Sequence, residues 1–119
     1  YNSCDETILK ILKILNQNGL TPYLAVLKNM KKDIGLINFS IDGISLAMDI
    51  PFSTKIFKIF PIIDKIVILN KGKIYLTKDS ILKKENYQRM YKNHKNLKKI
   101  RKIYNLENFE SSQSKRLGI

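Results

Sequence analysis

A tyrosine and a lysine three positions apart form the most suggestive chemical pair in this sequence. Tyr75 and Lys78 lie in the segment 72–80, which reads Gly-Lys-Ile-Tyr-Leu-Thr-Lys-Asp-Ser. The β-rich run 73–77 predicts a short strand, in which side chains three apart point to opposite faces. The two side chains therefore converge only if the strand bulges or ends between them. A phenol and an ammonium suit hydrogen bonding and stabilisation of negative charge, whereas the alternative is an exposed Lys-Asp turn.

Two other predicted strands end in charged side chains. The extended run 23–28 has alternating aliphatic residues and ends in Lys28. The clearest strand, 44–50, places its large apolar side chains on one face. Ser45 and Asp49 lie on the other face, so that this face is small and polar and ends in a carboxylate. Both charged residues can serve a binding site, and both can equally be solvated strand ends or salt-bridge partners.

Several common chemistries have no support in the sequence. Cys4 is the only cysteine and His94 the only histidine, which excludes an internal disulfide and a structural zinc site. The sequence has no glycine-rich phosphate loop, no Ser-His-Asp order and no paired-histidine metal motif. We therefore expect no metal site.

The elements that must position these residues predict an α+β fold. The 119 residues suit a single domain. Apolar periodicity predicts helices over 5–18, 54–69, 83–91 and 94–104, and strands over 23–28, 36–41, 44–50 and 73–77. Short neighbouring strands without βαβ regularity indicate a small antiparallel or mixed sheet covered by helices on one face. A helical C-terminal segment follows, and the tail from Phe109 has no clear periodicity.

The net charge of +12 is a weaker clue than its size implies. Only three of the 22 basic residues are arginine, the side chain that nucleic-acid recognition favours. No apolar run reaches the roughly 18–20 residues that cross a bilayer. Lys10 and Lys13 interrupt the early apolar stretch, so we predict no signal peptide and a cytoplasmic protein, with peripheral membrane contact as an alternative.

Several short motifs together resemble a known flavoenzyme family. They are Tyr23–Lys28, Leu46–Pro51, Lys73–Ser80, Met90-Tyr91 and Phe109–Gly118. Their order and spacing resemble the C-terminal part of FAD-linked oxidases of the vanillyl-alcohol-oxidase superfamily. The similarity is greatest to the decaprenylphosphoryl-ribose 2′-oxidase branch, with sugar-lactone and alditol oxidases as more distant relatives. The resemblance extends from about Leu20 to the C-terminus.

This resemblance implies a ferredoxin-like substrate or cap domain over residues 1–119, separated from the N-terminal FAD-binding domain that would be its partner. In such enzymes a hydride passes from a sugar hydroxyl carbon to FAD, and the nearest branch acts on a polyprenyl-phosphoryl sugar. We expect no nucleic-acid partner, because arginine is scarce among the basic residues. The resemblance also implies that this chain alone holds FAD weakly or not at all and turns over no substrate.

The resemblance also assigns roles to individual residues. Tyr75 and Lys78 match positions that approach the flavin and the substrate, so they are the predicted catalytic and cofactor-contacting residues. Lys28, Asp49 and Ser45 match substrate-binding positions, although Ser45 replaces an asparagine of the relatives. Ala47 lies where some relatives have a cysteine. A phosphate for Lys28 and a hydroxyl for Asp49 fit these side-chain types.

A different function is also open. The lysines of 92–102 predict a basic module that binds nucleic acid or another polyanion if they form one continuous patch with exposed aromatic rings. The same basic face would suit docking on an anionic membrane.

Overall fold

The fold is α+β, as the sequence predicted. The computed structural model describes residues 2–119, with side chains from Cys4 onward. In this part of the chain the helices are α1 (Asn2–Gln17), α2 (Ile56–Leu69), α3 (Lys84–Met90), α4 (His94–Ile103) and α5 (Ser112–Leu117). The strands are β1 (Leu24–Met30) and β2 (Gly43–Asp49), and η1 (Leu76–Lys78) and η2 (Leu106–Asn108) are 3-10 turns. None of these helices combines the length and the apolar composition needed to cross a bilayer.

Helix α1 ends at a glycine-dependent cap. Gly19 adopts a φ of 68°, a conformation that favours glycine. The N–H of Leu20 donates to the carbonyl of Leu15 at 2.9 Å, and the N–H of Gly19 donates to the carbonyl of Asn16 at 3.0 Å. This pair of bonds is a Schellman motif, and it turns the chain so that Leu20 is buried beside Leu15.

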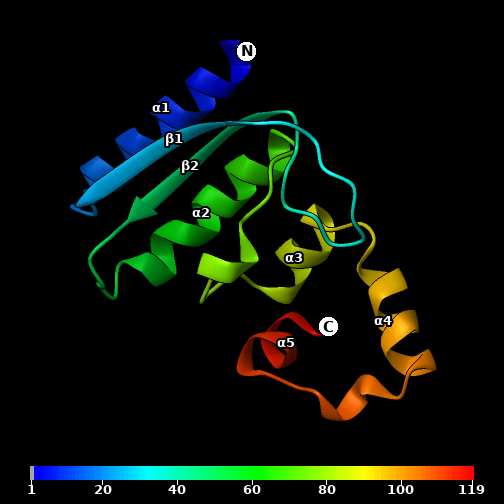
Figure 1. Cartoon of the computed structure of the whole chain (residues 1–119). Coiled ribbons are helices and arrows are strands. Elements are labelled where there is room, and N and C mark those ends of the chain that lie inside the picture. Colours follow the sequence, from blue (N-terminus) through cyan, green and yellow to red (C-terminus); the bar gives the residue numbers. More distant parts are fainter. Residues whose placement is uncertain (1) are drawn as a thin grey trace.

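The two strands form an antiparallel hairpin with a regular register. Leu24 pairs with Asp49 at one end, and Met30 pairs with Gly43 at the other. Met48 packs against the core that α1 and α2 build, and Figure 1 shows the strands alongside these two helices. Because successive strand residues point to opposite faces, Ser45 and Asp49 lie on the face turned away from Met48. Helices therefore cover one face of the sheet, as predicted.

Two buried clusters stabilise the chain, and α2 contributes to both. The first lies between α1 and α2 and contains Ile11, Leu15, Leu20, Ile63 and Ile66. The second lies around α3 and α5 and contains Leu82, Tyr87, Met90, Tyr91 and Leu117. Val67 of α2 packs against both clusters, so this helix connects the hairpin half of the molecule to the C-terminal half.

Two predicted strands are wrong. The segment 36–41 is irregular because its polar groups bond within the loop: the Asn38 amide donates to the carbonyls of Asp33 at 2.6 Å and Ser40 at 3.2 Å. The segment 73–77 gives way to η1, where the Gln113 side chain donates to the carbonyl of Leu76 at 2.5 Å. In both places side chains satisfy backbone groups that a sheet partner would otherwise have bonded.

The tail contains a helix that sequence periodicity did not indicate. Helix α5 begins after Ser111, which forms a capping box with Ser114, and ends at Gly118, whose φ is 67°. Leu117 is fully buried in the second cluster. A six-residue helix with one buried apolar residue is too short for a periodic signal, so only its caps could have predicted it.

Candidate functional site

The hairpin brings two of the predicted binding residues together. Lys28 and Ser45 are direct partners in the β1–β2 register, so their side chains are neighbours on one face of the sheet. Asp49 is on the same face but four residues further along β2, about 13 Å away at the usual rise of a strand. We call this surface the hairpin face and define it by Lys28, Ser45, Ala47 and Asp49.

A tight turn, not a strand, links the other two predicted residues. The N–H of Lys78 donates to the carbonyl of Tyr75 at 3.1 Å, which closes η1 between them. This bond brings their backbones within about 7 Å, the usual limit for a single turn. The Tyr75 ring contacts the Phe39 ring with centroids 5.0 Å apart, and Lys78 is exposed. A turn in place of the predicted strand therefore links the backbones of Tyr75 and Lys78, and the convergence of their side chains stays a prediction.

The C-terminal helix fixes this turn through a set of polar contacts that we call the C-terminal clamp, formed by Asp79, Gln113 and Arg116. Asp79 accepts hydrogen bonds from the backbone N–H groups of Ile81 and Leu82 at 3.0 and 2.8 Å. Its carboxylate also pairs with Arg116 at 2.9 Å, and only 4% of the Asp79 side chain is exposed. Asp79 is therefore a structural residue, and docking of the C-terminus explains Arg116.

The five predicted site residues fall into three groups. Lys28 adjoins Ser45, Tyr75 is one turn from Lys78, and Asp49 is separate. Across residues 4–119, no side-chain hydrogen bond or ion pair involves any of these five side chains. They are consequently free to bind an external group, but their convergence on one hollow stays a prediction.

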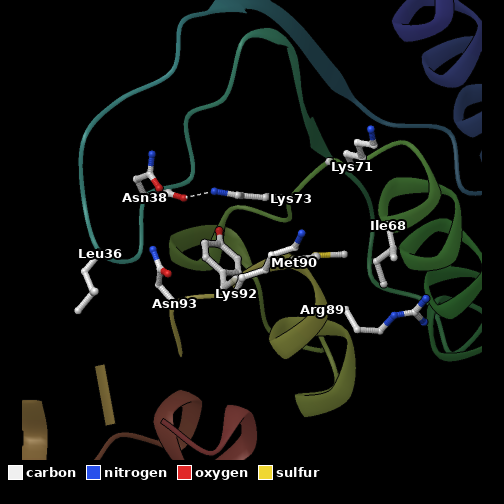
Figure 2. A pocket seen from close by; sticks show the side chains of 11 residues that line it. Leu36, Asn38, Ile68, Lys71, Lys73, Arg89, Met90, Lys92 and Asn93 are labelled. Atoms are coloured by element: carbon white, nitrogen blue, oxygen red, sulfur yellow. Dashed lines mark hydrogen bonds between the residues drawn. The ribbon is translucent and has the colours of Figure 1, made fainter. Parts of the chain in front are cut away.

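A cavity that the sequence did not indicate lies elsewhere, between the 36–38 loop, the end of α2 and the end of α3. Its volume is about 370 Å³. We call it the basic cavity; it is lined by Leu36, Asn38, Ile68, Lys71, Gly72, Lys73, Arg89, Met90, Tyr91, Lys92 and Asn93. In Figure 2, Lys71 and Arg89 lie near Ile68 at one side, and Leu36, Asn38 and Asn93 lie at the other. The lining includes four cations and no carboxylate among the residues described.

Lys73 is the most enclosed of these cations. Its ammonium donates to the backbone carbonyl of Asn38 at 2.7 Å and lies 5.2 Å from the centre of the Tyr91 ring (Figure 2). Burial, and secondarily the charge of Lys32, lower the pKa of Lys73 from its usual range. The Tyr91 hydroxyl in turn donates to the carbonyl of Ile74 at 2.8 Å, which fixes the ring. Lys73 is thus held in place by neutral groups only.

The comparisons with known proteins do not identify a family. No protein-family model matches the chain, and no curated protein matches it either. Function must therefore be argued from the residues and their geometry.

Proposed function

We propose that this chain is the substrate-binding part of an FAD-dependent oxidoreductase that oxidises a hydroxyl of a sugar or sugar derivative. The observation that supports this most is that the Lys78 ammonium is exposed and its neighbouring carboxylate is bonded elsewhere. Its neighbour Asp79 is the nearest carboxylate in sequence, yet that carboxylate is occupied by Arg116 and by two backbone N–H groups. Lys78 therefore keeps an exposed positive charge that no ion-pair partner within residues 4–119 neutralises.

An unpaired ammonium and a phenol one turn apart suit the edge of a flavin. FAD, bound by the partner domain, supplies the hydride acceptor. Lys78 stabilises the negative charge that develops during transfer, and it can also orient the hydroxyl that is oxidised. Tyr75 donates one hydrogen bond and offers an aromatic ring, which is held against Phe39. The pair has the side-chain chemistry for contact with a flavin, while the sequence has no glycine-rich loop for its pyrophosphate.

The hairpin face would bind the substrate. Lys28 and Ser45 are adjacent in the register, and no side chain in the described part of the chain bonds to either of them. An ammonium and a hydroxyl are therefore available together for a phosphate or a sugar oxygen. Asp49 would accept a hydrogen bond from a second sugar hydroxyl at the far end of β2. An extended substrate suits this spacing better than a single small group.

The apolar residues around the hairpin are consistent with a covering domain. Tyr23 is 83% exposed, and Leu24 and Leu27 are 56% and 59% exposed. Adjacent exposed apolar residues on an edge strand are unusual for an isolated domain and typical of an interface. Leu24 is the register partner of Asp49 and lies on the hairpin face, whereas Leu27 lies on the opposite face. In the proposed protein, the FAD-binding domain covers Leu24 and encloses the substrate on the hairpin face.

The proposal can be tested on the natural gene product that contains this chain. Purified, it should carry FAD, and a sugar substrate should bleach the flavin absorption under anaerobic conditions. The substitution Lys78→Met should leave the flavin content unchanged and slow bleaching by about 100-fold, the effect of removing one electrostatic contact to a developing charge. A gene product without flavin would overturn the proposal.

Lys58→Met provides a matched control because it removes the same charge from the exposed side of α2. It should bleach at the unaltered rate. Equal rates for Lys78→Met and Lys58→Met would remove Lys78 from the catalytic assignment. The isolated chain should not retain stoichiometric FAD after gel filtration, and tight retention would contradict the assignment of FAD binding to another domain.

Helix α4 favours a second function, binding of a nucleic acid. Its lysines at 95, 98, 99 and 102 follow the i, i+3, i+4, i+7 spacing and are all exposed, so they form one basic stripe. The helix contains no acidic residue. The rings of Tyr104 and Phe109 are exposed near its end, where Arg101 donates to the carbonyls of Leu106 and Phe109 at 3.1 and 2.8 Å.

Binding of a single-stranded oligonucleotide at several salt concentrations tests this second function. The logarithm of affinity should fall linearly with the logarithm of salt, and the double substitution Lys98→Met with Lys99→Met should reduce the slope by about 1.4 for a single strand. The double substitution Lys10→Met with Lys13→Met on α1 is the charge-matched control. Equal slopes for both double variants would exclude α4 as the binding surface.

A further inference from the structure

The charge of the basic cavity is not balanced by the groups around it. Lys71, Arg89 and Lys92 are exposed and, within the described chain, take part in no ion pair or side-chain hydrogen bond. Lys73 uses one donor for the carbonyl of Asn38, which leaves its other N–H groups unused. Four cations from two segments therefore surround one hollow with free donors.

Helix dipoles explain only part of this arrangement. The C-termini of α2 and α3 end at the cavity, and cations near a helix C-terminus are favourable. Each C-terminus carries only about half of a negative elementary charge. Two helix ends therefore offset about one of the four positive charges, and about three remain for an external anion.

The backbone conformation of Lys71 also supports a role for its side chain in the basic cavity. Lys71 N–H donates to Ile68 O at 3.0 Å and Gly72 N–H donates to Val67 O at 2.8 Å, which is the Schellman pattern that ends α2. Lys71 occupies the position of this motif where glycine is usual, with a φ of 57°. A lysine thus stands where the backbone itself favours glycine, and its side chain lines the basic cavity.

Gly72 then allows the close approach that this turn requires. A Cβ atom at Gly72 would lie 2.9 Å from Cγ1 of Val67 and 3.2 Å from its carbonyl oxygen. The glycine therefore cannot be replaced without displacing the end of α2. The floor of the basic cavity is consequently a fixed structure that positions the side chains on both sides of Gly72.

From this arrangement we infer that the basic cavity binds the phosphate group of a small phosphorylated molecule. An arginine and three lysines suit a dianionic phosphate, which accepts several charge-assisted hydrogen bonds. The volume of about 370 Å³ exceeds what a phosphate alone needs, and Leu36, Ile68 and Met90 add apolar walls for the attached group. The site differs from the hairpin face and does not depend on the proposed oxidoreductase function.

Isothermal titration calorimetry of the purified chain tests the inference with three probes: inorganic phosphate, ribose 5-phosphate and ribose. We expect both phosphates to bind and ribose to show no binding. Tighter binding of ribose 5-phosphate than of inorganic phosphate would indicate that the walls of the cavity contact the group attached to the phosphate. Equal affinities would indicate that the cavity binds the phosphate alone. Ribose binding as tight as that of ribose 5-phosphate would overturn the inference.

Three variants locate the binding. Lys73→Met should weaken phosphate binding about tenfold, the usual effect of losing one charge-assisted hydrogen bond. Lys71→Gly should weaken it similarly without lowering the melting temperature, because glycine suits the backbone at this position. Lys58→Met is the control: it removes one positive charge from α2 at a position more than two helical turns from Ile68. It should change the affinity for phosphate less than twofold. Equal effects of all three substitutions would show only a general charge effect and would contradict the inference.

The Lys71→Gly variant keeps the test valid if Lys73→Met fails to fold. Loss of binding in a variant that is as stable as the unaltered chain cannot come from unfolding. Undiminished binding in folded Lys71→Gly and Arg89→Met chains would place the phosphate outside the basic cavity.

Discussion

The hairpin half and the C-terminal half of the molecule hold their polar side chains in opposite ways. On the hairpin face, Lys28, Ser45 and Asp49 have no side-chain partner in the described chain. In the C-terminal half, Asp79 pairs with Arg116, and Tyr91 and Lys73 each donate to a backbone carbonyl. Figure 1 shows the hairpin at one side of the molecule and α3 and α5 together at the other.

This difference separates two uses of polar residues. Groups that are paired within the chain stabilise the fold, and groups that are left unpaired at the surface are available for a ligand or a partner. The basic cavity combines both uses, because Lys73 is held in place by Asn38 and the Tyr91 ring while its remaining donors stay free. Substitutions in the two halves should therefore differ in their effect on stability.

The largest difference should come from two aspartates. Asp79→Ala removes the acceptor for two backbone N–H groups and leaves Arg116 without its carboxylate, so it should lower the free energy of unfolding by about 3 kcal/mol. Asp49→Ala should change that free energy by less than about 0.5 kcal/mol, because Asp49 is exposed and unpaired. Urea unfolding measures both, and equal losses would contradict the contrast between the two halves.

Two stacked tyrosines sharpen the comparison within the C-terminal half. Tyr91→Phe removes the bond to Ile74 O and should cost about 1 kcal/mol. The Tyr87 hydroxyl is buried and has no hydrogen-bond partner in the described structure, so Tyr87→Phe should be neutral or stabilising. Burial raises the pKa of both phenols, which agrees with their enclosed position. A loss for Tyr87→Phe as large as that for Tyr91→Phe would show that the Tyr87 hydroxyl has a bonding partner in solution.

Lys71→Gly should have a small effect of opposite sign. The φ of 57° strains a lysine but not a glycine, whereas glycine increases the entropy of the unfolded chain. The two effects nearly offset each other, and thermal unfolding should show a change between zero and about 1 kcal/mol of stabilisation. A clear destabilisation would mean that the Lys71 side chain stabilises the fold itself, which would weaken its assignment to a ligand.

The smallest expected effect concerns Asp64 of α2, the helix shared by both halves. Burial raises the pKa of its carboxyl, despite a hydrogen bond from Asn86 at 3.0 Å. The folded state therefore binds this proton more tightly than the unfolded state. Asp64 consequently contributes a rise in stability as pH falls through its folded pKa toward the ordinary aspartate pKa of 3.8. Asp64→Asn should remove this contribution and should raise stability slightly at neutral pH, as urea unfolding at several pH values would show. A pH profile identical to that of the unaltered chain would contradict the assigned pKa shift.

The sequence predicted most of the helices and both strands of the hairpin because their patterns are long and amphipathic. It failed where side chains bond to the backbone across the fold. Gln113 lies 37 positions from Leu76, whose carbonyl it binds, and Lys73 lies 35 positions from Asn38. No local pattern contains such pairs, so the predicted strands 36–41 and 73–77 were wrong and the C-terminal clamp was missed.

The predicted site shows the same limit. Alternation in the 44–50 strand placed Ser45 and Asp49 on one face, and only the register adds Lys28 to that face as the partner of Ser45. The predicted strand around Tyr75 and Lys78 is replaced by a 3-10 turn, and the convergence of the two side chains stays a prediction. The basic cavity could not be predicted at all, because its walls come from a loop, a helix cap and a helix end that meet only in three dimensions.

A map of backbone amide chemical shifts during titration with ribose 5-phosphate most directly tests the division of roles between the two halves. We expect the amides of residues 71–73 and 90–93 to shift together and saturate. Those of Lys28, Ser45 and Asp49 should not, because the substrate site proposed on the hairpin face is completed only by the FAD-binding domain. Saturating shifts confined to the hairpin face would contradict this division of roles.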